Sequence, residues 1–260
     1  MSEDRTWETK EMLLFPIQRG RVYLDKVLEL KSVVAGYGDK TILQGVNLDV
    51  RESELVGLVG PNGSGKSTVL KSIFGMVKVS DGEIWFKGKD IKNRKPRENT
   101  EDSICYIPQG NNVFDKLTVD ENLQMGGILL RDRRELNRRI DSLYEKFPKL
   151  KNYKNTPCGR LSGGERQMVG ICRGLVMNPS FILIDEPSIG LSPILVKQTI
   201  ELIRRLREEF KVTVLIVEQN VPALITIVDR VWLLKTGKVV HEERVIDENT
   251  MDRLSELFLK

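Results

Sequence analysis

Scarce residue types exclude several kinds of site. A single histidine, His241, rules out a histidine-rich metal site and any relay that needs two histidines. The three cysteines have no C-x-x-C spacing, which predicts reduced thiols that pack as small hydrophobic residues in a cytosolic protein. They are Cys105, Cys158 and Cys172. Apolar runs such as 181–184 are far shorter than the roughly twenty residues of a membrane-spanning helix, so we expect no transmembrane segment.

The overall composition predicts a globular protein without marking a partner. Its 260 residues are 30% charged and 40% hydrophobic, which suits one large domain, or a core with one insertion, and argues against disorder. The net charge of +4 indicates neither nucleic acid nor anionic lipid. Residues 1–26 are an aperiodic N-terminal arm to which no function is assigned. The basic stretch 87–97 is interpreted as a solvated hairpin and loop, since no aromatic residue follows Phe86 on which a base could stack.

Buried strands alternate with helices along most of the chain. Short β-branched runs predict strands at 55–59, 181–184 and 212–217. Helical spacing of apolar residues follows these strands at 67–74, at 193–210 and from about 222. This alternation predicts a largely parallel sheet that is covered by helices on both faces. The charged stretch 118–151 reads as helical and interrupts the alternation as an inserted lobe would.

A glycine-rich loop between a strand and a helix is the strongest motif. It fits G-x-x-x-x-G-K-[ST], and its residues are Gly60, Pro61, Asn62, Gly63, Ser64, Gly65, Lys66 and Ser67, followed by Thr68. Glycines let successive N–H groups point into one concavity, and the following helix adds its positive N-terminus. Lys66 would neutralise the β- and γ-phosphates of a nucleotide, and Ser67 would hold Mg²⁺. From a glycine usage of about 7%, a chance match in this length is on the order of 1%.

Two adjacent carboxylates end the strand at 181–184. An apolar strand that delivers Asp185 and Glu186 together is costly unless the charges meet a cation. Asp185 suits Mg²⁺, directly or through water, and Glu186 suits polarisation of the water that attacks a γ-phosphate. Strands ending in Asp-Glu are common, so this reading gains its weight from the phosphate loop.

A second anion-binding motif opens the helix after residue 162. The run Leu161-Ser162-Gly163-Gly164-Glu165-Arg166-Gln167 places a serine and two glycines at a helix N-terminus. With this third motif the chain resembles the ATP-binding cassette ATPases, the motor subunits of ABC transporters, over about 27–259. In that family Ser162, Gly163, Gly164 and Glu165 would cover the γ-phosphate held by a partner subunit. The resemblance therefore implies ATP and Mg²⁺ as cofactors, with two ATP molecules sandwiched in a head-to-tail dimer of identical or related chains.

The resemblance also implies a fold and further site residues. The fold is α/β, a P-loop NTPase core of the RecA-like type with a mostly parallel sheet, an antiparallel β subdomain and a helical subdomain inserted at about 111–174. Residues 27–260 would form this ATPase domain. Tyr37 resembles the aromatic residue that stacks on adenine, and Gln109 matches the glutamine that reaches Mg²⁺ and moves when the helical lobe rotates. The family's transmembrane permease subunits dock on the lobe.

Two departures from the family pattern point to a subfamily. Gln219, in Val217-Glu218-Gln219-Asn220, takes the position where most members carry a histidine that contacts the γ-phosphate. Ser192 replaces an aspartate in the loop after Glu186. Both features look like the ATPases of branched-chain amino acid importers. A glutamine can donate to the γ-phosphate but does not titrate near neutral pH, so we expect Gln219 to be a neutral sensor and a catalytic residue beside Lys66 and Glu186.

The resulting expectation is an ATPase that powers an ABC importer of branched-chain or related amino acids. It would lie peripherally on the cytoplasmic face of the membrane, bound to permease subunits and served indirectly by an extracytoplasmic solute-binding protein, with no nucleic-acid partner. Two alternatives stay open: a soluble ABC ATPase of a non-transport complex, such as iron–sulfur assembly, and an importer ATPase for urea, amides or other amino acids. The interval 68–161 is too short for the coiled-coil arms of DNA-repair ATPases.

Overall fold

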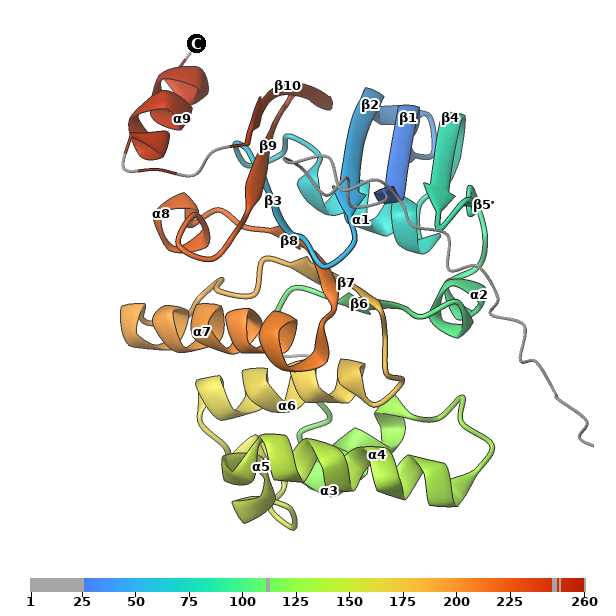
Figure 1. Ribbon diagram of the computed structural model, residues 1–260, viewed down its shortest axis with the longest axis vertical. Helices are drawn as coiled ribbons and strands as arrows, with labels where there is room; N and C mark the ends of the chain where they lie inside the picture. The colour runs from blue at the N-terminus through green and yellow to red at the C-terminus, as the bar shows by residue number, and fades with distance from the viewer. Residues whose placement is uncertain (1–25, 111–112, 245–246, 248, 260) are drawn as a thin grey trace, which may run out of the picture.

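The computed structural model describes residues 26–110, 113–244, 247 and 249–259. The N-terminal arm at 1–26 therefore lies outside the described residues except for Lys26. Two sheets and the helices around them make up the molecule, and they are stacked as layers along its longest axis (Figure 1). The outermost layers are an antiparallel sheet at one end and a group of helices at the other.

The antiparallel sheet has four strands in the order β2-β1-β4-β5. They are β1 (Lys26–Tyr37), β2 (Lys40–Arg51), β4 (Val79–Phe86) and β5 (Lys89–Asp90). Alternate residues of β1 and β2 are buried on one face, as a half-solvated sheet requires. Strand β1 ends at Tyr37, where a two-residue turn returns the chain to β2.

The central sheet has six strands in the order β10-β9-β3-β8-β7-β6. They are β3 (Leu55–Val59), β6 (Ile104–Ile107), β7 (Phe181–Asp185), β8 (Thr213–Val217), β9 (Arg230–Lys235) and β10 (Lys238–Glu243). All neighbouring pairs are parallel except β9 with β10. Every residue of β3, β7 and β8 is buried, so the largely parallel, doubly covered sheet expected from the sequence is confirmed.

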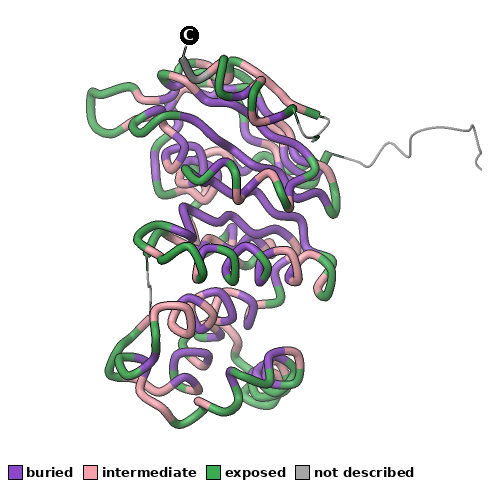
Figure 2. The backbone as a smooth tube through the Cα atoms, turned by 90° about the vertical axis from the view of Figure 1, so that its left-hand side faces the viewer, coloured by how far each residue is buried: buried purple, intermediate pink, exposed green. Residues whose placement is uncertain are grey.

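Two hydrophobic cores lie on opposite faces of the central sheet. Alternation along β7 sends Phe181 and Leu183 into the core shared with the antiparallel sheet and α1 (Lys66–Phe74), and Ile182 and Ile184 into the core under the other helices. The helices on the second face are α6 (Gly163–Leu175), α7 (Pro193–Phe210), α8 (Val221–Leu224) and α9 (Thr250–Leu259). Figure 2 shows the buried strands as a continuous band between these coverings.

The stretch 118–151 is helical, as expected, and it is divided into three helices. They are α3 (Val119–Gly126), α4 (Arg133–Lys146) and α5 (Pro148–Asn152), followed by the short 3₁₀ turn Cys158–Arg160. A Cβ on Gly126 would lie 2.2 Å from the Arg173 carbonyl oxygen, so the glycines that end α3 also let it pack closely on α6. Pro148 lacks the N–H that would continue α4 and starts α5 instead.

The basic stretch 87–97 contains structure that its composition concealed. The hairpin expected from the sequence is present, but α2 (Pro96–Glu101) begins inside the stretch where a loop was expected. Pro96 occupies the first helical turn, and the Glu98 carboxylate accepts a hydrogen bond from the Lys95 backbone N–H. Within the described ranges, no helix combines the length and the hydrophobicity that crossing a membrane requires.

Candidate functional site

The glycine-rich loop joins β3 to α1 at the carboxyl edge of the central sheet. Gly65 caps α1 in a left-handed conformation, with a φ of 107°, and no side chain caps the helix. The first turn of α1 also carries no acidic residue. The first N–H groups of a helix have no intrahelical partners, and here neither a capping side chain nor an acidic residue compensates them. They therefore present positive charge to the concavity of the loop. At Gly60 a Cβ would lie 2.1 Å from the Leu234 carbonyl oxygen, so only glycine fits there.

Lys66 lies almost wholly buried at the start of this helix. Its ammonium donates to the carbonyl oxygens of Gly60, at 3.0 Å, and Pro61, at 3.1 Å. The Glu186 Oε1 atom lies 3.9 Å from Nζ. Burial lowers the pKa of Lys66, and the nearby carboxylates of Glu186 and Asp185 offset part of that effect. A buried ammonium is costly unless its charge is compensated, and an anion with several oxygens would compensate it.

Asp185 lies at the end of β7 with a hydroxyl donor on each carboxylate oxygen. Ser67 Oγ donates to Oδ1 at 2.7 Å, and the Tyr106 hydroxyl donates to Oδ2 at 2.9 Å. Burial, together with the charge of Asp185, raises the pKa of Tyr106. The pairing of a hydroxyl with a carboxylate at Ser67 and Asp185 supplies the oxygen ligands that Mg²⁺ prefers. The two donors come from α1 and β6, on the same face of the central sheet as Asp185.

Glu186 follows with an unusual backbone. Its φ is +43°, in the left-handed region, and its N–H donates to the Val217 carbonyl oxygen at 2.9 Å. The Gln109 Nε2 group donates to its Oε2 atom at 3.0 Å. The turn aims the carboxylate away from the strand toward Lys66 and Gln109. The site thus holds a nearly buried carboxylate in a fixed direction.

A cavity of about 390 Å³ joins these elements. Loop residues line it together with the side chains of Glu186 and Gln219 and with Lys40 and Ile42 of β2. The loop residues concerned are Asn62, Gly63, Gly65, Lys66, Ser67 and Thr68. Ser64 Oγ is buried nearby with no hydrogen-bond partner among the residues that the structure describes. An unpartnered hydroxyl, bare helix N–H groups and a buried ammonium form a donor set that fits the phosphates of a nucleotide.

Glu218 is a buried carboxylate whose part in the site the sequence did not suggest. It accepts backbone N–H groups from Ser188 at 2.8 Å, Gln219 at 3.0 Å and Asn220 at 3.3 Å. One side chain therefore ties the loop after Glu186 to the loop that carries Gln219. In the sequence Val-Glu-Gln-Asn, only the glutamine stands out, because it occupies the position of the family's histidine.

The second anion-binding motif lies apart from the cavity. Ser162 caps α6, and its hydroxyl donates to Glu165 Oε2 at 2.7 Å while the Glu165 N–H points back to it at 3.4 Å. Ser162, together with the neighbouring Tyr153, lowers the pKa of Glu165. All four residues, 162–165, belong to the described part of the chain, and none lines the 390 Å³ cavity. Within the described residues, the two helix ends that the sequence predicts to bind anions are therefore separate.

Tyr37 lies at the edge of the site. Its ring is half exposed at the end of β1, where it pairs with Lys40 of β2. Lys40 lines the cavity but Tyr37 does not. A planar ring could therefore rest on Tyr37 only at the mouth of the cavity.

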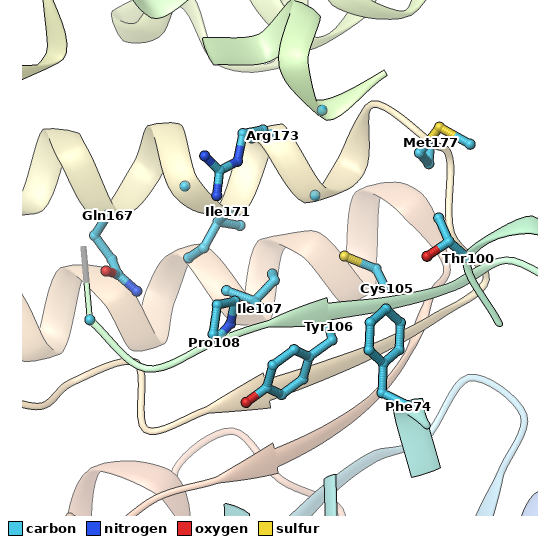
Figure 3. Close-up of a pocket in the computed structure, with 14 residues that line it drawn as sticks. Phe74, Thr100, Cys105, Tyr106, Ile107, Pro108, Gln167, Ile171, Arg173 and Met177 are labelled. Carbon is cyan, nitrogen blue, oxygen red and sulfur yellow. The ribbon is translucent and has the colours of Figure 1, made fainter. Parts of the chain in front are cut away.

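A smaller groove of about 160 Å³ lies along the edge strand β6 (Figure 3). Its walls come from β6, the end of α1 and the face of α6, including Tyr106, Phe74, Gln167 and Arg173. The Arg173 guanidinium also stacks over the half-exposed ring of Phe114. The cysteines pack as small hydrophobic residues, as expected: all three are buried, and Cys105 lines this groove.

Comparison with known proteins gives one consistent family. The family model described as "ABC transporter" matches residues 43–189. A probable branched-chain amino acid transport ATP-binding protein LivF of Archaeoglobus fulgidus is 41% identical over 82% of this chain and 90% of its own length. The high-affinity branched-chain amino acid transport ATP-binding protein BraG of Pseudomonas aeruginosa is 38% identical over 84% and 92%. The lipopolysaccharide export system ATP-binding protein LptB of Haemophilus influenzae is 33% identical over 88% and 96%.

Solved structures agree with this result. The ADP conformation of an ATP-binding cassette of an ABC transporter superposes with a TM-score of 0.81 at 28% identity, covering 90% of this chain and 99% of that one. A dimeric cassette in a post-hydrolysis state, bound to ADP and Pi, gives 0.70 at 30% identity, covering 84% and 98%. The α/β fold of P-loop ATPases expected from the three motifs is therefore confirmed.

Proposed function

Because the chain belongs to the ABC transporter family of ATPases, we propose that it powers the import of branched-chain or related amino acids. The observation that carries the proposal is that four predicted site residues line the same cavity: Lys66, Ser67, Glu186 and Gln219. The cargo rests on the LivF and BraG relatives, which are named for branched-chain amino acid transport. The LptB relative serves export of a different molecule, which is why the cargo needs its own test.

ATP would bind with its phosphates in the glycine-rich loop. The N-terminal N–H groups of α1 and the ammonium of Lys66 face the concavity and would neutralise the β- and γ-phosphates. The buried hydroxyl of Ser64 would gain a phosphate oxygen as its partner. Tyr37, at the mouth of the cavity, would stack on adenine.

Mg²⁺ would be held by Ser67 and Asp185, with Gln109 reaching it as well. The hydroxyl and the carboxylate already lie 2.7 Å apart, and both present oxygen. When bound, the ion would neutralise phosphate charge. Gln109 instead donates to Glu186 in this structure, so the glutamine would change partners when the metal site fills.

Glu186 would orient and polarise the attacking water. Its carboxylate lies at the cavity wall, between Lys66 and the amide of Gln109. Gln219, on the loop fixed by Glu218, would donate its amide to the γ-phosphate. The two roles differ in charge, because Glu186 must be ionised to act as a base whereas Gln219 stays neutral.

The complete site would need two ATP-binding subunits. Residues 162–165 present an anion-binding helix end that does not reach this chain's own cavity. A head-to-tail partner would bring the same helix end over the γ-phosphate. Dimeric cassettes among the similar structures support this arrangement. Ser162 would then exchange its intrachain bond to Glu165 for a bond to the nucleotide.

The helical subdomain at about 111–174 would receive the permease. This region contains α3, α4, α5 and most of α6, and it begins directly after the loop that carries Gln109. The protein would therefore lie peripherally on the cytoplasmic face, with permease subunits as partners and a solute-binding protein served through them. Residues 27–260 would form the ATPase domain.

Paired activity and uptake measurements test the proposal. Wild type should hydrolyse ATP and co-purify with membrane permeases, and Lys66→Ala should lose hydrolysis. A strain that lacks the gene should lose uptake of radiolabelled leucine and recover it with wild type but not with Glu186→Gln. Co-purification with soluble scaffold subunits, or leucine uptake that does not depend on the gene, would overturn the transport assignment or the cargo, respectively.

A further inference from the structure

Tyr106 is half-buried on β6, the edge strand of the central sheet. It pairs with Leu183 of β7 in a parallel register. Side chains alternate along these strands, so Cys105 and Ile107 face the core under the helices, and Tyr106 faces α1. Asp185 lies two residues beyond Leu183 and faces the same way. The register therefore places the phenol beside the carboxylate.

Contacts at both ends hold the tyrosine in place. Its hydroxyl donates to Asp185 Oδ2 at 2.9 Å. Its ring stacks on Phe74, with ring centroids 5.5 Å apart and an interplanar angle of 30° (Figure 3). Phe74 is the last residue of α1, and Ser67 near the start of the same helix donates to Asp185 Oδ1. Both ends of α1 are thus linked to one carboxylate, directly at Ser67 and through the tyrosine at Phe74.

We propose that Tyr106 is a positioning residue for the metal carboxylate, an inference that rests on the Mg²⁺ role proposed for Asp185. The phenol occupies Oδ2, on the side facing β6, and so holds Oδ1 toward Ser67, where the ion would lie. Without the phenol's hydroxyl the carboxylate could turn about its side-chain bonds. Partners that orient a metal ligand in this way usually contribute 10–100-fold to metal affinity.

The alternative is that the Tyr106 hydroxyl serves packing alone, since a tyrosine hydroxyl inside a protein usually finds some hydrogen-bond partner. The two readings differ in what the hydroxyl affects. A packing role predicts altered stability and unaltered metal dependence, whereas a positioning role predicts weaker Mg²⁺ binding with the nucleotide pocket intact. The same chain provides a matched control: Tyr144 on α4 is buried and donates its hydroxyl to Asp120 at 2.9 Å, in the helical region.

The test compares Tyr106→Phe with Tyr144→Phe in the full chain. Fluorescent ATP is titrated in EDTA and in Mg²⁺, and Mn²⁺ binding in the presence of ATP is followed by electron paramagnetic resonance. Tyr106→Phe should bind ATP in EDTA within about twofold of wild type, yet need about tenfold or more Mg²⁺ or Mn²⁺ for half-saturation. At saturating Mg²⁺ its kcat should return to within about threefold of wild type. Tyr144→Phe should leave all of these values unchanged.

Three results would decide against the inference. Wild-type metal dependence in Tyr106→Phe overturns the positioning role, and so does an equal shift in Tyr144→Phe. If wild type itself binds ATP without any Mg²⁺ dependence, the proposed metal role of Asp185 fails first, and the inference falls with it. Phe74→Leu removes the ring contact but keeps the hydroxyl, and it should shift the half-saturating Mg²⁺ in the same direction by a smaller factor.

Discussion

Lys66 and Glu186 face each other across the proposed nucleotide cavity, with 3.9 Å between Nζ and Oε1, and both side chains are nearly buried. The cation comes from the helix after β3 and the anion from the turn after β7, two strands that are separated in the sheet only by β8. Removing one member of such a pair leaves the other uncompensated. A useful substitution here therefore removes the charge of the side chain and keeps its size and shape.

Glu186→Gln keeps the shape of the side chain and removes its charge. We expect hydrolysis to fall about 10²–10⁴-fold, because the water loses its base, while ATP still binds. An ATP-bound dimer should then accumulate and be visible by size-exclusion chromatography in ATP and Mg²⁺. Glu208→Gln, at an exposed position of α7, is the control and should behave as wild type. Continued turnover by Glu186→Gln without a dimer would move the catalytic role elsewhere.

The lowered pKa of Lys66 predicts a pH dependence of ATP binding. Phosphates favour the charged ammonium, so above the lowered pKa of the free protein each binding event must take up a proton. Affinity should therefore fall as pH rises, and the fall should begin below the ordinary lysine value of about 10.4. Titrations with fluorescent ATP from pH 7.5 to 10 would measure it. Lys66→Met should bind weakly with little slope; an equal slope in this variant would assign the effect to another group.

Two substitutions of Gln219 distinguish the effect of its hydrogen bond from the effect of a titrating side chain at this position. Gln219→Ala should slow hydrolysis about tenfold or more with the permease present and leave ATP affinity largely intact, since one donor to a charged phosphate is lost. Gln219→His restores a donor and should add a pH dependence near 6.5, which wild type lacks at this position. ATPase profiles from pH 5.5 to 8.5 compare the three proteins. Wild-type rates in Gln219→Ala would show that the amide is not a sensor.

Removal of the Glu218 carboxylate should lower both the stability of the protein and its rate of ATP hydrolysis. Glu218→Ala leaves the buried Ser188 N–H without its acceptor, a loss of about 1–3 kcal/mol, and frees the loops that carry Ser188 and Gln219. Urea unfolding measures the first effect and ATPase assays the second. Glu208→Ala removes an exposed carboxylate and should stay within about 0.5 kcal/mol of wild type. An unchanged urea midpoint in Glu218→Ala would mean that water replaces the carboxylate.

Local patterns predict much of the fold. Strands at 55–59 and 213–217 and the helix at 193–210 follow from β-branched runs and helical spacing, which need no knowledge of the rest of the chain. Helix α2 does not, because it has six residues and its cap is formed by side chains within a run of charge. Nor does the division of 118–151, which depends on how closely α3 approaches α6 at Gly126.

The candidate site shows the same division between local and distant causes. The phosphate loop and the pair Asp185-Glu186 are recognisable because each motif is contiguous. Tyr106 is not, since its partner Asp185 lies 79 residues away and meets it only through the parallel register of β6 and β7. Glu218 has a neighbouring partner in Gln219, but its bond to Ser188 spans 30 residues. Sequence patterns name the groups that do chemistry better than the groups that hold them.

The left-handed backbone of Glu186, with its φ of +43°, has a consequence for how this chain can evolve. A side chain with a Cβ pays roughly 1–2 kcal/mol to adopt that conformation, and glycine or asparagine adopts it more readily. Selection for stability alone would therefore replace the glutamate. Under the catalytic role proposed for Glu186, selection for turnover would keep the glutamate in spite of this cost. In a lineage released from that selection, position 186 should be among the first to change, and the inactive descendant should be harder to unfold than its ancestor.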